Sequence, residues 1–492
     1  MMTMGRVSAR LCGIVLAAAA AHGQERTPAG GRVPAAGPDA AKAAVVAALD
    51  ARQAAYAGVA RQIWQFAEVG YQEAQSSALL AEQAEAAGFT VQRAVAEIPT
   101  AFVATWGSGR PVLAFLAEYD ALPGLSQEAA PERRPRAEGA PGHGCGHHLL
   151  GTASLAAAIA VKDWLAAARR PGTVRLYGTP AEEGGSGKAY MLRAGLFQDV
   201  DVALAWHPGD RNDASPQSSL ANMNAKFRFH GVSAHAAASP ERGRSALDAV
   251  EAMNFMVNLM REHVPQETRI HYVITRGGGA PNVVPDFAEV YTYARHPDIR
   301  TLDGIWARIV DAAKGAALGT GTTMDHEITG AVYNVLPNEY LAGLAFANMQ
   351  RVGGYAYSPD EQAFAEAIRT TLPDPGLPLG SQAVVQPQRG GVGNASTDLG
   401  DVSWNVPTVE VSAATWVPGT PAHSWQAVAA GGTTIGAKGM MVAARTLALT
   451  ALDLVLDPAH AARAREEFDR RRGSFRYTPR VGDRKPPLDY RK

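Results

Sequence analysis

In the first half of the chain, short apolar runs alternate with helical patterns, and this alternation limits the possible folds more than any other feature. The runs 112–120, 173–177 and 200–206 are typical of buried strands, and the segments 149–168 and 188–194 between them have helical patterns. Strands that alternate with helices form a parallel or mixed sheet covered on both faces. We therefore predict an α/β fold with a central, mostly parallel sheet flanked by helices.

The length of 492 residues predicts more than one domain. Residues 223–331 differ from the rest, because their strand patterns have one polar face and precede or follow helices in the order of an antiparallel α+β unit. We predict a catalytic domain formed by residues 40–222 and 332–457, interrupted by an inserted α+β domain at 223–331. The charged tail at 458–492 receives no predicted function.

The N-terminus has the pattern of a secretory signal. Arg6 and Arg10 precede an apolar run at 11–21, and small residues follow it. The run is shorter than the roughly 20 residues that span a bilayer. We predict a signal peptide at 1–23, a linker at 24–39 and export, with the bacterial periplasm as destination, and we expect no membrane-spanning segment in the mature chain.

Charge and cysteine content narrow the function. Lys and Arg number 46 against 47 Asp and Glu, so no basic excess points to a nucleic-acid partner. The two cysteines are Cys12 and Cys145. After signal cleavage Cys145 would remain alone, which excludes an internal disulfide and raises the question of what the thiol does.

The neighbours of Cys145 suggest an answer. The sequence from His143 to His148 is HGCGHH, and thiolate and imidazole together are good ligands for zinc and similar ions. The spacing is too tight for a structural zinc finger. The alternative is a glycine-rich turn in which the histidines are incidental.

Further polar residues follow the predicted strands. Asp120 ends one strand, Glu182 and Glu183 follow another, His207 ends a third, and His423 lies in a loop after the strand at 407–411. In open α/β sheets, ligands bind beyond the carboxyl ends of the strands. One glutamate of the pair could ligate a metal while the other transfers protons. Taken alone, the pair is equally compatible with a solvated helix start.

Together these motifs resemble the metal-dependent amidohydrolases that include aminoacylase, glutamate carboxypeptidase and the plant auxin-conjugate hydrolases. The branch of p-aminobenzoyl-glutamate hydrolases is the most similar one. The resemblance runs from about residue 40 to about 457. It rests on AEYDALPGL from Ala117, GHGCGHHLLGTA from Gly142, TPAEEGGSGK from Thr179, AWHP from Ala205, GVSAHAAASPERGRSALDAV from Gly231, PNVVPD from Pro281, STDLGDVSW from Ser396 and GTPAHSWQ from Gly419.

This resemblance implies a two-metal centre holding zinc or manganese. Cys145 would bridge the two ions. Glu183 and His423 would complete one ion, and His147 and His207 the other. At the position after His147 the family has Asp or Asn, whereas this chain has His148, which leaves the choice of metal open.

The resemblance also implies roles in catalysis and substrate binding. Glu182 would be the general base and later the acid, and Asp120 would orient a metal ligand. In the inserted domain, His235 would reach the active site of a partner subunit and polarise the scissile carbonyl, which requires a homodimer. Asn282 and Arg295 would hold polar groups of the substrate, and an arginine suits a free carboxylate.

Three functions are compatible with the sequence. The first is hydrolysis of an aryl-acyl amino acid such as p-aminobenzoyl-glutamate. The second is the same reaction on another N-acyl amino acid, an auxin conjugate or a dipeptide. The third is a binding protein that has lost activity, against which the presence of Glu182 with all five ligands argues.

Overall fold

The computed structural model describes residues 37–491. The predicted signal peptide lies outside these residues, as does most of the predicted linker. Helix α1 (Pro38–Ala51) begins before the predicted end of the linker at residue 39.

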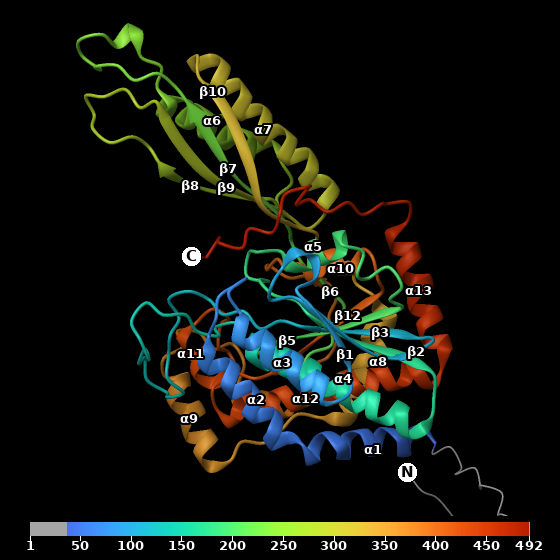
Figure 1. Ribbon diagram of the computed structural model, residues 1–492. Coiled ribbons are helices and arrows are strands. Elements are labelled where there is room, and N and C mark those ends of the chain that lie inside the picture. The colour runs from blue at the N-terminus through green and yellow to red at the C-terminus, as the bar shows by residue number, and fades with distance from the viewer. Residues whose placement is uncertain (1–36, 492) are drawn as a thin grey trace, which may run out of the picture.

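A six-stranded sheet organises the larger part of the molecule, the body (Figure 1). Its strands are β1 (Thr90–Arg93), β2 (Phe102–Ser108), β3 (Val112–Ala117), β4 (Gly172–Gly178), β5 (Val202–Gly209) and β12 (Thr408–Ala414). The order is β1-β2-β4-β3-β5-β12, and the last four are mutually parallel. This confirms the predicted mostly parallel sheet. Strands β1 and β2, which were not predicted from the sequence, form an antiparallel edge.

The strands bury both of their faces. In β3, Leu113 and Phe115 join one core, whereas Ala114 and Leu116 join another on the opposite face. The first core lies under α2, α3, α8 and the two long helices α4 and α12; the second lies under α5 and α10. The bounds are α2 (Gln53–Phe66), α3 (Ala74–Ala86), α4 (His147–Ala168), α5 (Gly187–Arg193), α8 (Glu339–Val352), α10 (Leu399–Ser403) and α12 (Thr434–Leu456).

Helices α4 and α12 are long and apolar enough to cross a membrane, contrary to the expectation that no later segment has this property. Most of each helix is buried in the body, and the two contact each other extensively. Burial in the shared core therefore explains the apolar composition of the two helices.

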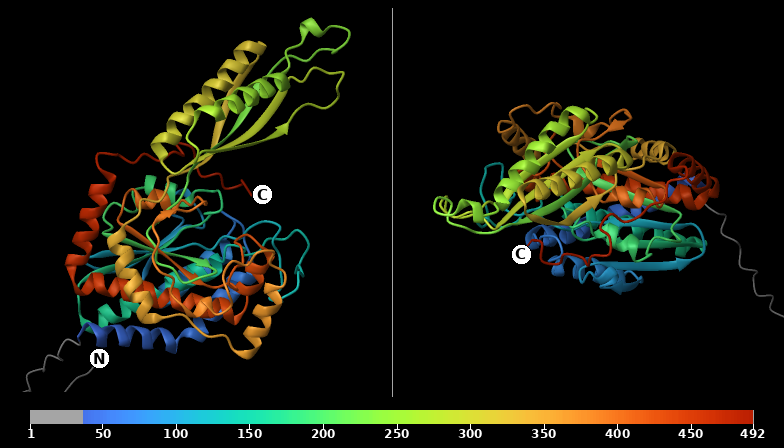
Figure 2. Two further views of the ribbon diagram at one scale, coloured as in Figure 1. Left: turned by 180° about the vertical axis from the view of Figure 1, so that it is seen from behind. Right: turned by 90° about the horizontal axis from the view of Figure 1, so that it is seen from above.

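A second unit, which we call the lid, projects from the body (Figures 1 and 2). Its antiparallel sheet has the order β10-β7-β9-β8, and α6 and α7 cover one face around a separate core. The bounds are β7 (Ala221–His230), α6 (Ala246–Met260), β8 (Arg269–Arg276), β9 (Phe287–His296), α7 (Ile299–Thr320) and β10 (Thr323–Val332). The sequence analysis missed β10.

Short elements complete the body. Strands β6 (Gln217–Ser218) and β11 (Gly391–Val392) pair in parallel below the lid. Helices α9 (Pro359–Arg369) and α13 (Pro458–Arg472) cover its outside, whereas α11 (Trp425–Gly431) is almost wholly buried. Helix α13 and the residues after it form the segment predicted as a tail, and they are packed against the rest of the chain.

Two glycines test the packing of the central helix. A Cβ at Gly439 in α12 would overlap the carbonyl of Ala414 on β12, whereas a Cβ at Gly343 in α8 meets nothing. We expect Gly439→Ala to lower the free energy of unfolding by about 1–3 kcal/mol or more through overpacking. The matched Gly343→Ala should raise it by up to about 1 kcal/mol through helix propensity. Chemical denaturation of both variants measures the difference, and equal stabilities would contradict the close contact of α12 with β12.

Candidate active site

The candidate active site lies at the carboxyl edge of the body sheet, where the turn before α4 meets β5. Gly146 adopts a φ of 76°, and a Cβ there would lie 2.7 Å from the Cβ of Pro208. A glycine therefore lets this turn approach the strand, and Cys145 Sγ lies 3.3 Å from His207 Nε2. His207 lies within β5, two residues before its end, and not beyond the strand.

Two sets of potential ligand atoms share the Cys145 sulfur. One set is Cys145, His147 and His207, and the other is Cys145, Glu183 and His423. Within each set, all ligand atoms lie within 4.8 Å of one another. The structure thus brings together the five residues that the sequence analysis assigned as ligands, from the turn before α4, the loop after β4, strand β5 and the loop after β12.

The chemistry of these atoms fits metal ions. Among the described residues, His147 Nε2 and Glu183 Oε1 are buried without a hydrogen-bond partner. His423 Nε2 lies 3.2 Å from Glu183 Oε1. Unpaired buried polar atoms are costly unless something compensates them, and a cation between them would do so. A thiolate, imidazole nitrogens and a carboxylate suit zinc and neighbouring transition metals.

Asp120 links the two sets. Its Oδ1 lies 2.9 Å from His147 Nδ1, and its Oδ2 accepts a hydrogen bond of 2.9 Å from the Glu183 backbone N–H. The carboxylate is almost completely buried. This contact fixes the ring of His147 with Nε2 toward Cys145, the role that the resemblance implied for Asp120.

Burial raises the pKa values of two side chains at the site, Cys145 and Glu182. Burial and then the charge of Glu183 raise the pKa of the Cys145 thiol, so the thiol is protonated at neutral pH without a cation nearby. A bound cation would favour the thiolate. Burial, followed by the charges of Glu118 and Glu183, raises the pKa of Glu182 well above its ordinary value. The protonated form of Glu182 is therefore favoured more strongly than that of an exposed glutamate.

Comparison with known proteins decides the family. Residues 114–426 match the model of "Peptidase family M20/M25/M40". The chain is 43% identical over 437 residues to a p-aminobenzoyl-glutamate hydrolase chain of Escherichia coli (strain K12), covering 83% of this chain and 91% of the relative. The chain belongs to the M20/M25/M40 peptidase family. It is a metal-dependent amidohydrolase, as the resemblance predicted.

Other relatives and solved structures agree with this assignment. Xaa-Arg dipeptidase of Mus musculus is 32% identical over 426 residues, which cover 83% of this chain and 88% of the relative. The crystal structure of the aminobenzoyl-glutamate utilization protein from Klebsiella pneumoniae superposes with a TM-score of 0.57 at 19% identity, covering 83% of this chain and 98% of that chain. This structural likeness shows that the M20/M25/M40 fold is shared.

Beneath the cluster lies a buried ion network that the sequence analysis did not assign. Lys188 Nζ is 2.7 Å from Glu118 Oε1 and also contacts the Asp398 carboxylate, and all three side chains are buried. Glu118 Oε2 lies 3.2 Å from His147 Nε2, and the group Glu118, His147 and Glu182 is compact enough to hold a metal ion as well. Lys188 and Asp398 lie in motifs that carried the resemblance, but nothing in their local sequence signals a contact between them.

A second unassigned carboxylate shapes the turn before Glu182. Glu73 is fully buried and accepts hydrogen bonds from the Ala181 N–H, at 2.8 Å, and from Thr100 Oγ1, at 2.9 Å. Burial and the charge of Asp120 raise the pKa of Glu73 to about 8. Ala181 has a φ of 58°, so this bond holds a backbone conformation that residues other than glycine rarely adopt.

The lid separates the predicted catalytic residue His235 and the predicted substrate-binding residue Asn282 from the other predicted substrate-binding residue, Arg295. Arg295 pairs with Asn222 at the end of the lid sheet next to the body. His235 and Asn282 lie in the two loops beyond the opposite end, where His230 pairs with Phe287 and His235 bridges to Val283. The ten residues of β7 span about 30 Å between these ends. Arg295 therefore lies toward the chain's own cluster, and His235 and Asn282 lie far from it.

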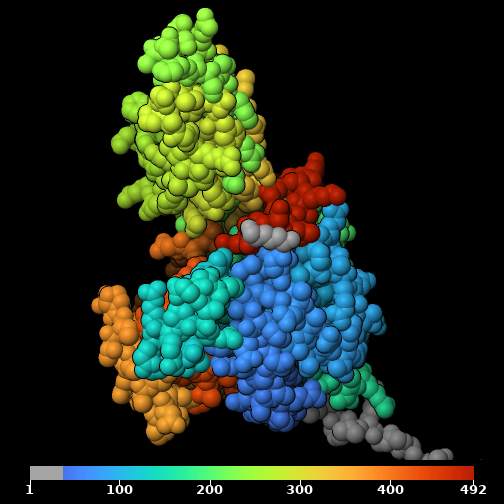
Figure 3. Space-filling model, turned by 60° about the vertical axis from the view of Figure 1, so that its left-hand side comes forward, coloured from blue at the N-terminus to red at the C-terminus, as the bar shows by residue number. Residues whose placement is uncertain are grey.

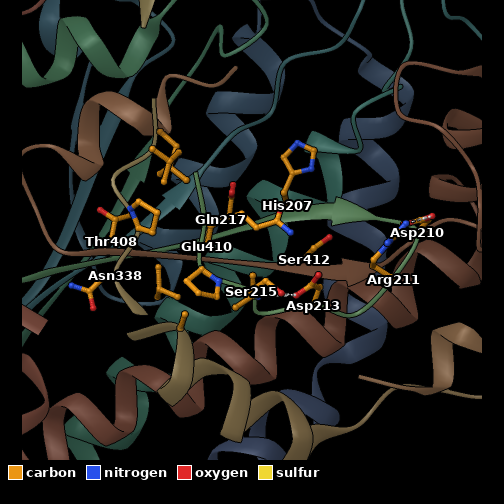
Figure 4. A pocket seen from close by; sticks show the side chains of 17 residues that line it. His207, Asp210, Arg211, Asp213, Ser215, Gln217, Asn338, Thr408, Glu410 and Ser412 are labelled. Atoms are coloured by element: carbon orange, nitrogen blue, oxygen red, sulfur yellow. Dashed lines mark hydrogen bonds and ion pairs between the residues drawn. The ribbon is translucent and has the colours of Figure 1, made fainter. Parts of the chain in front are cut away.

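A separate cavity of about 270 Å³ adjoins His207 from behind (Figure 4). Its lining includes Asp210, Asp213, Ser412 and Glu410, and burial raises the pKa of Glu410 to about 7, with Glu118 adding to the rise. In Figure 4 the His207 ring points away from Asp213 and Ser412. The cavity thus shares His207 with the metal cluster without being part of it.

The position of the Cys145 sulfur in both sets of ligand atoms predicts how metal content depends on this residue. We expect Cys145→Ala to lose both ions, because both sets of ligands contain it, and His423→Ala to lose or weaken only one. The control is His263→Ala, an exposed histidine outside the cluster. Metal-to-protein ratios from elemental analysis after gel filtration measure the effect. Two ions retained by Cys145→Ala would contradict the bridging position.

Proposed function

We propose that this chain hydrolyses the amide bond of a small N-acyl amino acid, with p-aminobenzoyl-glutamate as the preferred substrate. The observation that carries the proposal is two sets of metal-ligating atoms that share one sulfur, with the Glu182 carboxylate close to His147 of one set. The substrate is proposed from the 43% identical relative, whose name states that activity.

Each residue has a definite task in the proposed mechanism. Two divalent ions, zinc or manganese, would supply Lewis acidity and lower the pKa of a water. Glu182 takes the proton of the attacking water and gives it to the leaving amine. Asp120 keeps His147 and the Glu183 peptide in place during this transfer. Arg295, whose Nε is buried without a partner in the described part of the chain, offers its guanidinium to the substrate carboxylate.

A second candidate is the hydrolysis of a dipeptide that ends in arginine. The mouse relative of 32% identity is named for this activity. The cavity behind His207 is lined by the carboxyl groups of Asp213 and Glu410, which suit a basic side chain; its third acid, Asp210, is paired with Arg211 of the same cavity. This candidate shares the mechanism and differs only in the side chain that is recognised.

We also propose that two copies of the chain pair through their lids. Strand β8 is an edge of the lid sheet, and its Tyr272, Val273 and Ile274 are exposed. On the adjacent helix α6, Phe255 and Leu259 are 65% and 57% exposed. A free edge strand beside exposed apolar side chains favours pairing with another strand. A second copy would continue the sheet and cover these side chains.

The proposed dimer assigns a function to His235 and Asn282 at the far end of the lid. His235 and Asn282 are too far from their own cluster to contact a substrate there, as the length of β7 indicates. In a dimer joined at β8, the tip of each lid would approach the body of the partner subunit. His235 would then donate a hydrogen bond to the developing oxyanion in the partner's site.

The substrate proposal is tested with metal-loaded protein. We expect kcat/KM for p-aminobenzoyl-glutamate to exceed that for benzoyl amino acids, indole-acetyl-aspartate and dipeptides ending in arginine. Glu182→Gln should keep both ions and lose turnover by about 10²–10⁴-fold. Preference for the arginine dipeptides would favour the second candidate, and near-normal turnover of Glu182→Gln would move the base elsewhere. Hydrolysis of no substrate by protein that holds both ions would refute the proposed activity.

The trans role of His235 is tested by mixing two inactive variants. Co-expressed Glu182→Gln and His235→Ala chains form mixed dimers in which one site has both intact residues, if His235 acts across the dimer. Random pairing should then restore about a quarter of wild-type activity. Each variant expressed alone serves as the control. If His235 acts within its own chain, the mixture stays as inactive as its components.

A further inference from the structure

The segment that follows α13, residues 473–491, runs between the lid and the body, and we call it the C-terminal strap (Figures 1 and 3). It begins on an aromatic cluster near the base of the lid. The Phe475 ring lies 4.7 Å from the Trp404 ring, and Tyr477 donates a hydrogen bond of 2.7 Å to Asp401. The Thr478 carbonyl accepts one of 2.8 Å from Tyr333.

The middle of the strap contacts both units. Toward the lid, Arg480 pairs with Asp303 on α7, and Arg484 donates to the Ile328 carbonyl on β10. Toward the body, Arg193 on α5 donates to the carbonyls of Gly482, at 2.6 Å, and of Arg484, at 2.7 Å. The strap therefore ties the lid to the body.

The end of the strap reaches the turn at residues 181–185, which carries Glu182 and Glu183 and which we call the catalytic turn. Tyr490 donates a hydrogen bond of 3.0 Å and Arg491 one of 2.7 Å, both to the Glu183 backbone carbonyl. The N–H of Glu183 is already bound by Asp120. The peptide units on both sides of the Glu183 side chain are thus held, one by Asp120 after β3 and one by the strap.

Residues 70–72 of the body contact the end of the strap around Tyr490. The hydroxyl of Tyr490 occupies the space that a Cβ at Gly70 would fill, and its ring meets the Tyr71 ring edge-on at 5.6 Å. Gln72 donates a hydrogen bond of 2.7 Å to the Leu488 carbonyl. Tyr71 in turn donates 2.7 Å to the Gly185 carbonyl at the far end of the same turn. Three consecutive residues of the body thus receive the strap.

We propose that Tyr490 and Arg491 are positioning residues for the metal centre. By binding the Glu183 carbonyl, they fix the turn that aims Glu182 and Glu183 in opposite directions, one toward Glu118 and the other toward His423. The proposal rests on the metal-ligand role proposed for Glu183. It predicts that the affinity of the ion held by Glu183 and His423 depends on the last residues of the chain.

The first test is a chain that ends at Asp489. We expect the affinity for one of its two ions to fall by about 10- to 100-fold, as for other residues that orient a metal ligand. The other ion should bind as in the wild type. Competition of zinc between the protein and a chromophoric chelator measures both affinities without any substrate. In parallel, kcat should fall more than KM rises, because the base on the same turn is displaced.

Single variants keep the test valid if truncation prevents folding. Arg491→Met removes the donor and keeps the length of the side chain, and Arg491→Lys should restore most of the lost zinc affinity. Tyr490→Phe removes only the hydroxyl. The control is Arg476→Met, because Arg476 is an exposed strap residue without a hydrogen bond or ion pair among the described residues.

The outcomes separate the two proposals. Wild-type zinc affinities and kcat in the truncated, Arg491→Met and Tyr490→Phe chains would overturn the positioning role. An equal loss of zinc affinity in Arg476→Met would also overturn it, because substitution of any strap residue would then have the same effect. A wild-type chain that binds two zinc ions but hydrolyses no N-acyl amino acid would refute the proposed activity and leave the affinity test decisive. A wild-type chain that binds neither zinc nor manganese would overturn both.

Discussion

The Asp120 carboxylate joins parts of the active site that come from separate elements, and the remaining geometry depends on it. One oxygen faces His147 at the start of α4, and the other binds the Glu183 peptide after β4. Because Asp120 follows β3, between β4 and β5 in the sheet, one side chain fixes the positions of the two neighbouring connections. Both oxygens have donors, so the buried charge is compensated and the His147 ring cannot turn freely.

A concentration of carboxylates at one sheet edge requires compensation, and Lys188 supplies part of it. Its ammonium lies between Glu118 and Asp398, below Glu182. Burial lowers the pKa of Lys188, but the charges of Asp398 and Glu118 outweigh this effect and keep the side chain charged. A buried ion pair is favourable only when further groups satisfy both partners, and here Asp398 also accepts from the Lys188 backbone N–H. Glu182 therefore faces this network, whereas Glu183 faces His423.

The length of the lid separates the residues that are proposed to contact the substrate. A ten-residue antiparallel sheet is too long for both of its ends to face one site. Arg295 at the near end and His235 at the far end can serve a substrate together only if the far end belongs to another copy. The C-terminal strap spans the base of the same lid, so the lid, the catalytic turn and the chain terminus form one connected structure.

Strand and helix periodicity, visible along the chain, predicted the α/β class and the inserted unit, and the resemblance to the amidohydrolases indicated which His, Cys and Glu residues after strands are the ligands. The same patterns could not show that Glu73 holds the Ala181 peptide, that Lys188 meets Glu118 and Asp398, or that Tyr490 and Arg491 bind Glu183. In each case the partners lie far apart in sequence, 70 residues for Lys188 and Glu118. Only packing brings such side chains together, and only burial then shifts their charges. Residue types and their spacing were enough to indicate which chemistry was possible. The folded chain decided which groups fix the positions of the catalytic residues, which groups compensate their charges, and which residues lie far from the metal cluster.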